Sequence, residues 1–521
     1  MVRFVSFAGL TGVTLASFFL LHAEDPQRDR SPAFPRLFLR DVVVSNSDRN
    51  LKDTDRFLNA EPGIAVNPVS PRKIVISAFS GAWTTEGQAP PANAPIWYSK
   101  DGGRLWTKEF TIPSPPGVSR SAVNQSPCDQ TFDYGRDGVL YGTFLLSGGG
   151  QEGGNCSTVG VTESQENSSD AVYTGGTTDP ANQGAWSWRV TNGKTQPTTQ
   201  MLADQPWVVV GKDPSRRWHE NVYVGYQGSN SMQVAVAEAH LPLDFSVDHQ
   251  SGLAVPFRGN PGQRIAADHR TGALYALHQE QGTADCSSAL AVSYVLNRSL
   301  NGGVSWELNG NPDGISVSQV CSHQDLFSNL FGEPEPNTIA GGVNPLRGGI
   351  DALAVDSRSG AVYVVFGEYD AGVNRDRIGI VQVTPGHDES VQVQPAHFVS
   401  GTQHQSALPG VAVAENGAVG VLYDTADGLA EDSGRPYFSI HFALSRDDGK
   451  TFEDVVAQKF LFPEGAPAGN FGPRPLGDYQ QLKSLGNVFY GVFSGDGKPF
   501  GRPFHKIDPI FLKTSAERGD E

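Results

Sequence analysis

The sequence predicts an all-β fold, a β-propeller of seven blades, each a four-stranded antiparallel sheet. Three observations predict it. A hairpin pattern returns seven times along 521 residues, the chain is rich in Gly (60) and Pro (35) with only 18% charged residues, and one strand-like segment precedes the first repeat. Internal repetition at a period of tens of residues is typical of radially repeated folds. An open pair of β-sandwiches is the alternative.

Each repeat joins a short apolar strand to a second strand rich in Val, Tyr and Phe through a polar turn, which is typical of a β-hairpin. The Gly, Asn and Asp residues of these turns tolerate positive φ. After most repeats two further strands can be read, which predicts four strands per blade. The repeats begin at Glu61, Asp129, Asp204, Gln263, Asp351, Pro409 and Gly477.

The last repeat is one strand short, because only "IDPIFLKT" follows "VFYGVFSG". The segment "RLFLRDVVV" at 36–44 reads as a strand that has no partner near it in the sequence. We therefore predict that this N-terminal strand pairs into the last blade and closes the ring, which removes free sheet edges. The predicted propeller domain spans 36–515, after a linker at 24–35 and before a disordered tail at 516–521.

The first 23 residues are typical of a secretory signal peptide. Arg3 precedes an apolar run from Phe4 to Leu21, and Ala23 stands before a charged stretch. An uncleaved membrane anchor is the alternative. We expect a secreted or extracellular monomer, periplasmic in a Gram-negative host, with no stable membrane span after cleavage. The formal net charge of −17 and the lack of a basic stripe argue against a nucleic-acid partner.

The chain contains four cysteines, Cys128, Cys156, Cys286 and Cys321. An even number in an exported protein predicts two disulfides, for which three pairings exist. We predict the two shortest loops, Cys128–Cys156 and Cys286–Cys321. A zinc site is the alternative, but no Cys-x-x-Cys spacing occurs.

One motif, "SKDGGRLW" at 99–106, returns as "SLNGGVSW" at 299–306 and "SRDDGKTF" at 445–452. The Asp or Asn can accept backbone N–H groups within its own turn, the Gly allows positive φ, and the aromatic ring can be buried between blades. We interpret the motif as turn architecture rather than catalysis. These roles fall to Asp101, Gly103, Trp106, Asn301, Gly303, Trp306, Asp447, Gly449 and Phe452. The motif resembles the Asp-box, or BNR repeat, of the sialidase-like superfamily.

The innermost strands of a propeller surround a channel, so the residues that open each repeat should meet at one mouth. Charged groups brought together there shift one another's pKa and suit a sugar-binding or hydrolytic funnel. The alternative is that they tie the blades together through backbone N–H groups. The residues at these strand entrances are Glu61, Asp129, Asp204, Arg264, Asp351 and Asp478, with Tyr479 beside the last.

The stretches "EPGIAVNP", "ADQPWVVV" and "GDYQQL" resemble those of secreted BNR-repeat proteins of the sialidase-like kind. The resemblance implies hydrolysis of a terminal, acidic sugar by a tyrosine nucleophile with carboxylate helpers and a carboxylate-binding arginine set. Tyr479 takes the tyrosine's place. The Phe/Tyr-Arg-Ile-Pro motif of sialidases is absent. The implied catalytic carboxylates are Asp129, Asp204, Asp478 and Glu61, and the implied substrate-binding residues are Arg264, Arg474 and Asp351.

Two other functions remain open, a non-catalytic glycan- or protein-binding propeller and a polysaccharide lyase. A lyase would need a proton-abstracting base, for which His278, His323 and His404 are candidates. The segment 309–348 lacks clear strands and is expected to be an insertion over the channel mouth. We expect no cofactor. A structural calcium ion is the alternative, at 367–377, where oxygen ligands concentrate.

Overall fold

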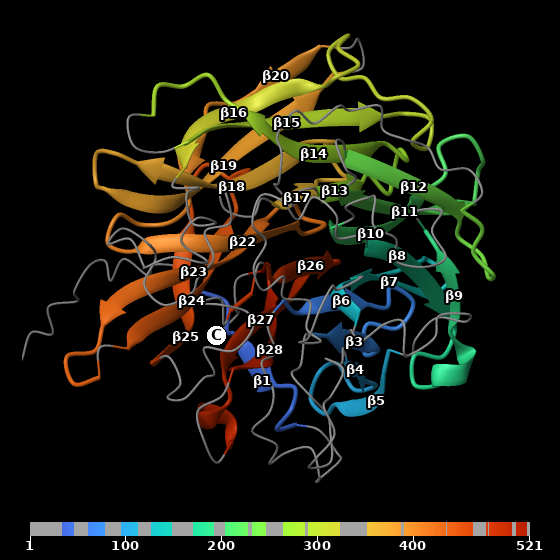
Figure 1. Cartoon of the computed structure of the whole chain (residues 1–521), viewed down its shortest axis with the longest axis horizontal. Coiled ribbons are helices and arrows are strands. Elements are labelled where there is room, and N and C mark those ends of the chain that lie inside the picture. The colour runs from blue at the N-terminus through green and yellow to red at the C-terminus, as the bar shows by residue number, and fades with distance from the viewer. Residues whose placement is uncertain are drawn as a thin grey trace, which may run out of the picture.

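The computed structural model consists of seven antiparallel sheets arranged radially around a central axis (Figure 1), which confirms the predicted seven-bladed propeller. Within the described residues, the only helical elements are short 3-10 turns such as η2 (Gln183–Ala185) and η4 (Lys498–Phe500). The structure describes residues 34–45, 61–78, 95–112, 127–147, 170–191, 204–227, 232–245, 264–286, 290–322, 352–386, 390–433, 435–461, 476–477, 479–502 and 507–517.

Blades 1 to 4 follow one another along the chain. Blade 1 contains β2 (Gly63–Val66), β3 (Ile74–Ser77), β4 (Pro95–Ser99) and β5 (Thr107–Thr111). Blade 2 contains β6 (Pro127–Tyr134), β7 (Leu140–Ser147), β8 (Asp170–Thr177) and β9 (Ser187–Val190). Blade 3 shows three strands among the described residues, β10 (Asp204–Lys212), β11 (Glu220–Gln227) and β12 (Met232–Glu238). Blade 4 contains β13 (Arg264–Ala267), β14 (Leu274–Gln281), β15 (Leu290–Ser299) and β16 (Ile315–Ser322).

Blades 5 to 7 complete the ring. Blade 5 contains β17 (Ala352–Val355), β18 (Val362–Asp370), β19 (Arg375–Pro385) and β20 (Val391–Val393), and β21 (His397–Phe398) also pairs with β19. Blade 6 contains β22 (Gln405–Val413), β23 (Val419–Leu429), β24 (Pro436–Ser445) and β25 (Glu453–Leu461). Blade 7 contains β26 (Gln481–Leu485), β27 (Val488–Asp496), β28 (Ile507–Ser515) and the N-terminal β1 (Phe38–Asp41).

The first strand of each repeat lies at the centre, and β2, β6, β10, β13, β17, β22 and β26 contact one another in that order around a closed circle. Side chains lock neighbouring inner strands together. Thr131 Oγ1 of β6 accepts the N–H of Val208 at 2.9 Å, and Asp133 Oδ2 accepts the N–H of Val210 at 2.9 Å. Because both residue numbers rise together, β6 and β10 run in the same direction. The strand entrances of these blades therefore lie at one mouth of the channel.

The N-terminal strand closes the ring, as predicted. β1 pairs with β28 from Phe38↔Lys513 to Asp41↔Ile510. Beside this pairing lies a buried ion pair, in which Arg502 Nε and Nη2 contact Asp508 at 2.6 and 3.0 Å. Asp41 is also fully buried against Asp508. Since one guanidinium faces two buried carboxylates, burial first and then the Asp508 charge raise the pKa of Asp41 well above its ordinary value.

The three recurring motifs, at 99–106, 299–306 and 445–452, form similar turns between the third and fourth strands of blades 1, 4 and 6. In blade 1, Ser99 Oγ accepts the N–H of Gly103 at 2.9 Å, and Asp101 Oδ1 accepts those of Arg104 and Leu105 at 2.9 and 3.0 Å. Asn301 and Asp447 accept the equivalent N–H groups of Ser305 and Thr451, each at 2.9 Å.

These turns also join blades. Trp106 is fully buried and meets Phe511 of blade 7 edge to face, with ring centroids 5.4 Å apart. Gly103 has φ 90°, and a Cβ there would lie 2.1 Å from the Phe511 ring, so only glycine fits. Trp306 is 5% exposed in a cluster that includes residues of blade 3, whereas Phe452 is only partly buried. The motif therefore buries its aromatic ring between blades to different extents.

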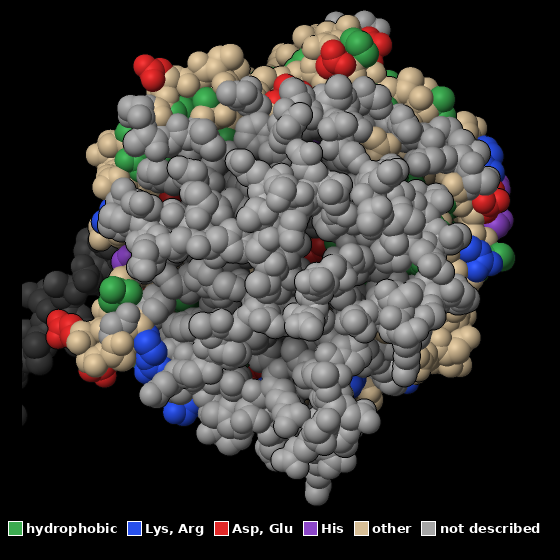
Figure 2. Space-filling view, in the orientation of Figure 1, with side chains coloured by type: hydrophobic (Ala, Val, Ile, Leu, Met, Phe, Trp, Pro, Cys, Tyr) green, Lys and Arg blue, Asp and Glu red, His purple; other side chains and the backbone are tan. Residues whose placement is uncertain are grey.

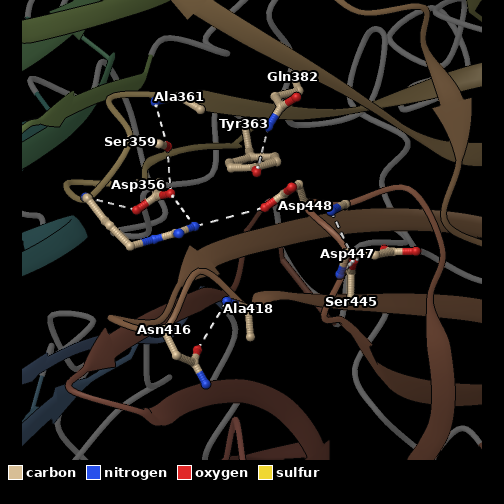
Figure 3. A network of polar contacts seen from close by, with 12 residues as sticks. Asp356, Ser359, Ala361, Tyr363, Gln382, Asn416, Ala418, Ser445, Asp447 and Asp448 are labelled. Carbon is tan, nitrogen blue, oxygen red and sulfur yellow. Dashed lines mark hydrogen bonds and ion pairs between the residues drawn. The ribbon is translucent and has the colours of Figure 1, made fainter.

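Turns at the far ends of inner strands also contact the neighbouring blade, as the turn after β17 in blade 5 does with blade 6 (Figure 3). After β17, Asp356 accepts the N–H of Arg358 at 2.9 Å and the hydroxyl of Ser359 at 2.6 Å, which shapes the turn. Arg358 then reaches Asp448 of blade 6 at 3.9 Å. In the same way, Arg136 of blade 2 pairs with Glu220 of blade 3 at 2.9 Å. These contacts hold neighbouring blades together on the face opposite the strand entrances.

Cys286 and Cys321 form a disulfide with Cα atoms 5.5 Å apart, as predicted. The predicted partner of Cys128, Cys156, lies outside the described residues. The expectation that 309–348 lacks strands was wrong, because Ile315–Ser322 forms β16 and carries Cys321. A register shift in the pairing of β15 with β16 interrupts the alternation of "ISVSQVCS", which hid this outer strand.

The predicted signal peptide lies outside the described residues, as does the predicted linker except for its last two residues. Of these, Phe34 meets Phe442 of blade 6 edge to face, with ring centroids 6.2 Å apart. No helix in the described part of the chain is long and apolar enough to cross a bilayer. On the face shown in Figure 2, acidic and basic side chains of the described residues both occur along the rim. No basic stripe is visible among those described side chains on this face.

We predict that Asp41→Asn stabilises the protein at neutral pH. Asparagine keeps an acceptor for the Val44 N–H and can donate to Asp508 without carrying a charge. Because the folded state binds the Asp41 proton more tightly, wild-type stability falls as pH rises from about 3.8 toward the raised pKa, by at most about 1.4 kcal/mol per pH unit. Urea unfolding across this range should show that the difference in free energy of unfolding between the variant and the wild type grows as pH rises. A difference that stays constant with pH would contradict the tighter binding of the Asp41 proton in the folded state.

We also predict that Trp106→Ala lowers the free energy of unfolding by about 3–5 kcal/mol, since it leaves a cavity against Phe511. Phe452→Ala is the matched control in the equivalent turn of blade 6 and should cost less, because Phe452 is only partly buried. Chemical denaturation of both variants checks the order. Equal losses would show that the aromatic position does not act through burial between blades.

Candidate functional site

A cavity of about 680 Å³ occupies the central channel. Its walls are the inner strands β10, β13, β17, β22 and β26, with Asp133 of β6. It extends from Trp207, Arg264 and Tyr479 at the strand entrances to His269 and Glu415 in the turns at the other end. Small side chains line much of the wall between, so the channel holds open space rather than a packed core.

Three side chains meet across the channel at the mouth where the inner strands begin. The Arg264 guanidinium lies 4.3 Å from the Trp207 ring centre and 5.7 Å from that of Tyr479. The Trp207 and Tyr479 rings meet edge to face at 5.7 Å. Because these residues come from blades 4, 3 and 7, the contact bridges blades that are not neighbours in the ring. We call Trp207, Arg264 and Tyr479 the mouth cluster.

The mouth cluster combines a cation with two aromatic faces, an arrangement that is strongest when it is shielded from water. Arg264 is 1% exposed and Tyr479 2% exposed, while Trp207 is half-buried. Arg264 Nη1 donates to Gln205 Oε1 at 3.1 Å. The charge of the guanidinium is thus held in a fixed direction at the wall of the cavity.

The backbone on the C-terminal side of Tyr479 is anchored in two other blades. Gln480 Nε2 donates to the Leu408 carbonyl at 2.7 Å and to Asp424 Oδ1 at 2.9 Å, both in blade 6. Gln481 Oε1 accepts the N–H of Ile64 in blade 1 at 2.8 Å. Burial raises the pKa of Asp424 well above its ordinary value, although the Gln480 hydrogen bond opposes this. The phenol ring is therefore positioned by buried amide contacts.

Four strand entrances share a left-handed backbone residue, namely Glu61, Asp129, Gln205 and Leu408, with φ between 44° and 56°. In blades 2, 3 and 6 the pairing register of the inner strand also shifts at this point, which is a β-bulge. Bulges re-aim side chains and are common beside functional sites. In blade 3 the bulge places Gln205 within hydrogen-bond distance of Arg264.

Of the residues predicted for the site, the structure brings Arg264 and Tyr479 together. Glu61 and Asp129 are buried at the entrances of blades 1 and 2, at 6% and 8% exposure, and are not among the residues that line the cavity. Asp204 is the first residue of β10, and its side chain is not described. The remaining predicted residues, Asp351, Arg474 and Asp478, lie outside the described residues.

The two described histidines among those proposed for a lyase, His278 and His404, do not lie at the mouth cluster. His278 is fully buried in blade 4, with Nε2 3.1 Å from Glu280, so it has no access to a substrate. His404 is 43% exposed and lies 3.9 Å from Asp427, away from the cavity lining. His323 lies outside the described residues.

At the predicted calcium segment, Asp370 pairs with Arg377 at 2.8 Å, so its carboxylate is already matched by a cation. Across the described ranges no group of three or more His, Cys, Asp or Glu side chains is arranged to hold a metal ion.

The sequence analysis did not find Trp207 or Gln205. It also did not find the ion pair across the channel between Lys483 Nζ and Asp133 Oδ1, which are 3.4 Å apart. One signal could have found Trp207. It lies two residues before Val209, which aligns with Arg264 when the two repeats are matched at Asp213 and Asp268, so it is on the same face of its strand as that position. The cross-channel ion pair has no such signal, because its members lie 350 residues apart.

We predict that Gln480→Leu lowers the free energy of unfolding by about 1–3 kcal/mol, because it leaves the buried Asp424 and the Leu408 carbonyl without this donor. A double-mutant cycle with Asp424→Asn, followed by urea unfolding, checks it. The two changes should be non-additive, since both act on one hydrogen bond. Additive losses would show that Asp424 and Gln480 do not hold the Tyr479 segment together.

No protein-family model matches the sequence, and no curated protein matches it. Among solved structures, similarity extends to a polysaccharide lyase (9% identity, 92% of this chain and 96% of that one, TM-score 0.44). A second is an α-L-arabinofuranosidase of Fusarium graminearum, with 10% identity over 88% of this chain and 95% of that one and a TM-score of 0.41. A third is a sialidase from Streptococcus pneumoniae, with 11% identity over 91% of this chain and 70% of that one and a TM-score of 0.38. Each likeness is distant in sequence and in geometry, so the functional proposals rest on the residues of this chain.

Proposed function

We propose that this protein is a secreted glycan-processing enzyme, an exo-acting glycosidase that takes a terminal acidic sugar at the channel mouth. The observation that carries the proposal is the mouth cluster, in which a buried arginine lies 5.7 Å from the ring of a tyrosine at one end of a cavity of about 680 Å³. Protein cavities that bind small molecules have volumes of about 300–1,000 Å³ and combine apolar walls with a few oriented polar groups. This cavity fits that description.

Tyr479 is the proposed nucleophile or proton handler. A neutral phenol approaches a carboxylate-bearing sugar carbon more readily than an anionic carboxylate does, and a nearby carboxylate base must take the phenol proton. Glu61 and Asp129 at the strand entrances of blades 1 and 2 are the described candidates for that base. The Arg264 cation beside the ring favours negative charge that develops on the phenol oxygen.

Substrate binding falls to the other members of the mouth cluster. Arg264 supplies a positive field for the sugar carboxylate, and its hydrogen bond to Gln205 fixes its orientation. Trp207 is half-buried and offers an apolar surface to the carbon face of a sugar ring. Asp204, Asp351, Arg474 and Asp478 remain proposed members of this site.

An extracellular location is part of the proposal. The predicted signal peptide and the Cys286–Cys321 disulfide support it, because disulfides persist in oxidising compartments. We propose that the protein acts as a monomer and needs no cofactor.

The second candidate is a non-catalytic propeller that binds a glycan or a protein through the same mouth. One observation favours it, the 2% exposure of Tyr479, because a nucleophile must be reached by its substrate. The two candidates differ in whether Tyr479 Oη is required for a chemical product.

We predict that Tyr479→Phe lowers the rate of product release by at least about 100-fold. The substrates are a panel of sialylated glycans and uronic-acid polysaccharides, and mass spectrometry measures the released sugars. Tyr294→Phe is the matched control. That hydroxyl is buried between blades 4 and 5, where it donates to the Gly367 carbonyl at 3.3 Å, far from the mouth cluster. It should leave turnover unchanged.

The products distinguish the candidates. A saturated monosaccharide released by the wild type and lost only in Tyr479→Phe supports the glycosidase. An unsaturated product would replace it with a lyase. No product from any substrate, together with retained glycan binding, would replace the enzyme with the binding propeller.

A further inference from the structure

A second cavity, of about 210 Å³, lies between blade 5 and the turn that joins β24 to β25 in blade 6. β22 begins at the channel mouth, and β23 and β24 follow in alternating directions, so this turn lies on the opposite face. The cavity shares no residue with the central channel cavity. We call it the blade-5/6 groove.

The groove is built from two blades. Tyr363 and Ile380 are buried in blade 5, and Gly449 of blade 6 packs over them, where a Cβ would lie 3.1 Å from the Tyr363 ring. His397 Nε2 contacts the Gly449 carbonyl and fixes the two blades against each other. The residues that line the groove are Tyr363, Ile380, Gln382, Gln394, Pro395, His397, Asp448, Gly449 and Lys450.

Polar groups from both blades converge at the groove. The Tyr363 hydroxyl accepts a hydrogen bond from Gln382 Nε2 at 2.8 Å, and it lies near Asp448 (Figure 3). Burial raises the pKa of Tyr363 to about 12, so the hydroxyl keeps its proton and can donate. The rim therefore presents a carboxylate and amides beside the exposed apolar surface of Pro395, and the phenol of Tyr363 lies at the floor.

Asp448 occupies a position that glycine takes in the other two turns of this kind. Gly102 and Gly302 have φ 81° and 74°, and Asp448 has φ 59° at the equivalent place. A side chain in this left-handed region costs free energy that glycine does not. Turn formation therefore does not require the carboxylate, yet blade 6 places one, 53% exposed, at the edge of the groove.

We propose that the blade-5/6 groove binds a single neutral sugar unit, as a second carbohydrate site separate from the channel. A volume of 210 Å³ lies below the range for drug-sized ligands, about 300 Å³ and above, and suits one ring rather than an oligosaccharide. Paired hydroxyls match a carboxylate and amides, while the carbon face of the ring matches Pro395.

The charges in the groove favour a neutral ligand. Asp448 and Lys450 are the carboxylate and the ammonium among the lining residues, so their formal charges cancel. Arg358, 3.9 Å from Asp448, is also paired with Asp356 at 3.3 Å. A neutral ligand therefore needs no additional counter-charge in the groove. A hydroxyl of such a ligand donates to the Asp448 carboxylate, in a hydrogen bond strengthened by the charge.

The test is titration of the purified full chain carrying Tyr479→Phe, so that no turnover disturbs binding. The neutral probes are the methyl glycosides of glucose, galactose, mannose and N-acetylglucosamine, and methyl glucuronide is the acidic probe for comparison. NMR measures the binding of each probe. We expect saturable binding of at least one neutral glycoside with a Kd on the order of 1 mM.

Asp448→Gly removes the carboxylate and keeps the turn, because Gly102 and Gly302 already form it. We expect it to weaken binding roughly tenfold or more with no loss of Tm. Gln394→Ala, a second change at the exposed rim, should also weaken binding. Asp313→Gly is the matched control, an exposed carboxylate in the turn before β16 of blade 4, and should bind normally.

Three results would overturn the proposal: no saturable binding of any neutral glycoside, unchanged affinity in both Asp448→Gly and Gln394→Ala, or tighter binding of the glucuronide than of every neutral probe. Failure here leaves the channel-mouth enzyme untouched. Conversely, loss of the proposed activity does not affect this binding, because the probe protein already lacks the Tyr479 hydroxyl.

Discussion

The pairing of β1 with β28 is the constraint on which the rest of the structure depends. A radial array of sheets holds its channel open only if every inner strand has a neighbour on both sides. The final blade is completed by residues more than 460 positions away from β28, the strand with which they pair, so both ends of the chain are tied into one sheet. The buried contact of Arg502 with Asp508 lies at that junction, beside Asp41, whose pKa burial raises well above its ordinary value.

The mouth cluster depends on this closure. Tyr479 belongs to the blade that the N-terminal strand completes, and it reaches Trp207 and Arg264 on the far side of the channel. Gln480 and Gln481 anchor the same segment to blades 6 and 1. A loosened seventh blade would therefore displace the tyrosine from its cation, and stability and the proposed chemistry are coupled through one sheet.

The backbone and side-chain contacts differ between the two faces of the propeller. At the mouth, four strand entrances carry a left-handed residue, and in blades 2, 3 and 6 the strand register shifts beside it. On the opposite face, carboxylate-capped turns contact the neighbouring blade, as the turn of Asp356 and Arg358 does (Figure 3). Asp448 departs from the repeated turn chemistry in a position where glycine suffices. Such a local departure from the repeated pattern is where function is expected.

The sequence by itself determined the repeat, the closure by the segment at 36–44, the Cys286–Cys321 bridge and the turn roles of Asp101, Asn301 and Asp447. Each of these rests on local turn chemistry, on β-strand alternation or on simple counting, which short stretches encode. It also singled out Arg264 and Tyr479 among many charged strand entrances. It did not reveal β16, whose outer position weakens its alternation, or the buried state of His278.

Only the tertiary structure decided which residues meet. Trp207, Arg264 and Tyr479 are far apart in sequence and come from three blades, and Lys483 meets Asp133 across the channel. The groove beside Asp448 likewise requires two blades to be set side by side. Local patterns determine strands and turns because those interactions span a few residues, whereas a ring brings together groups whose separation along the chain leaves no trace in either segment.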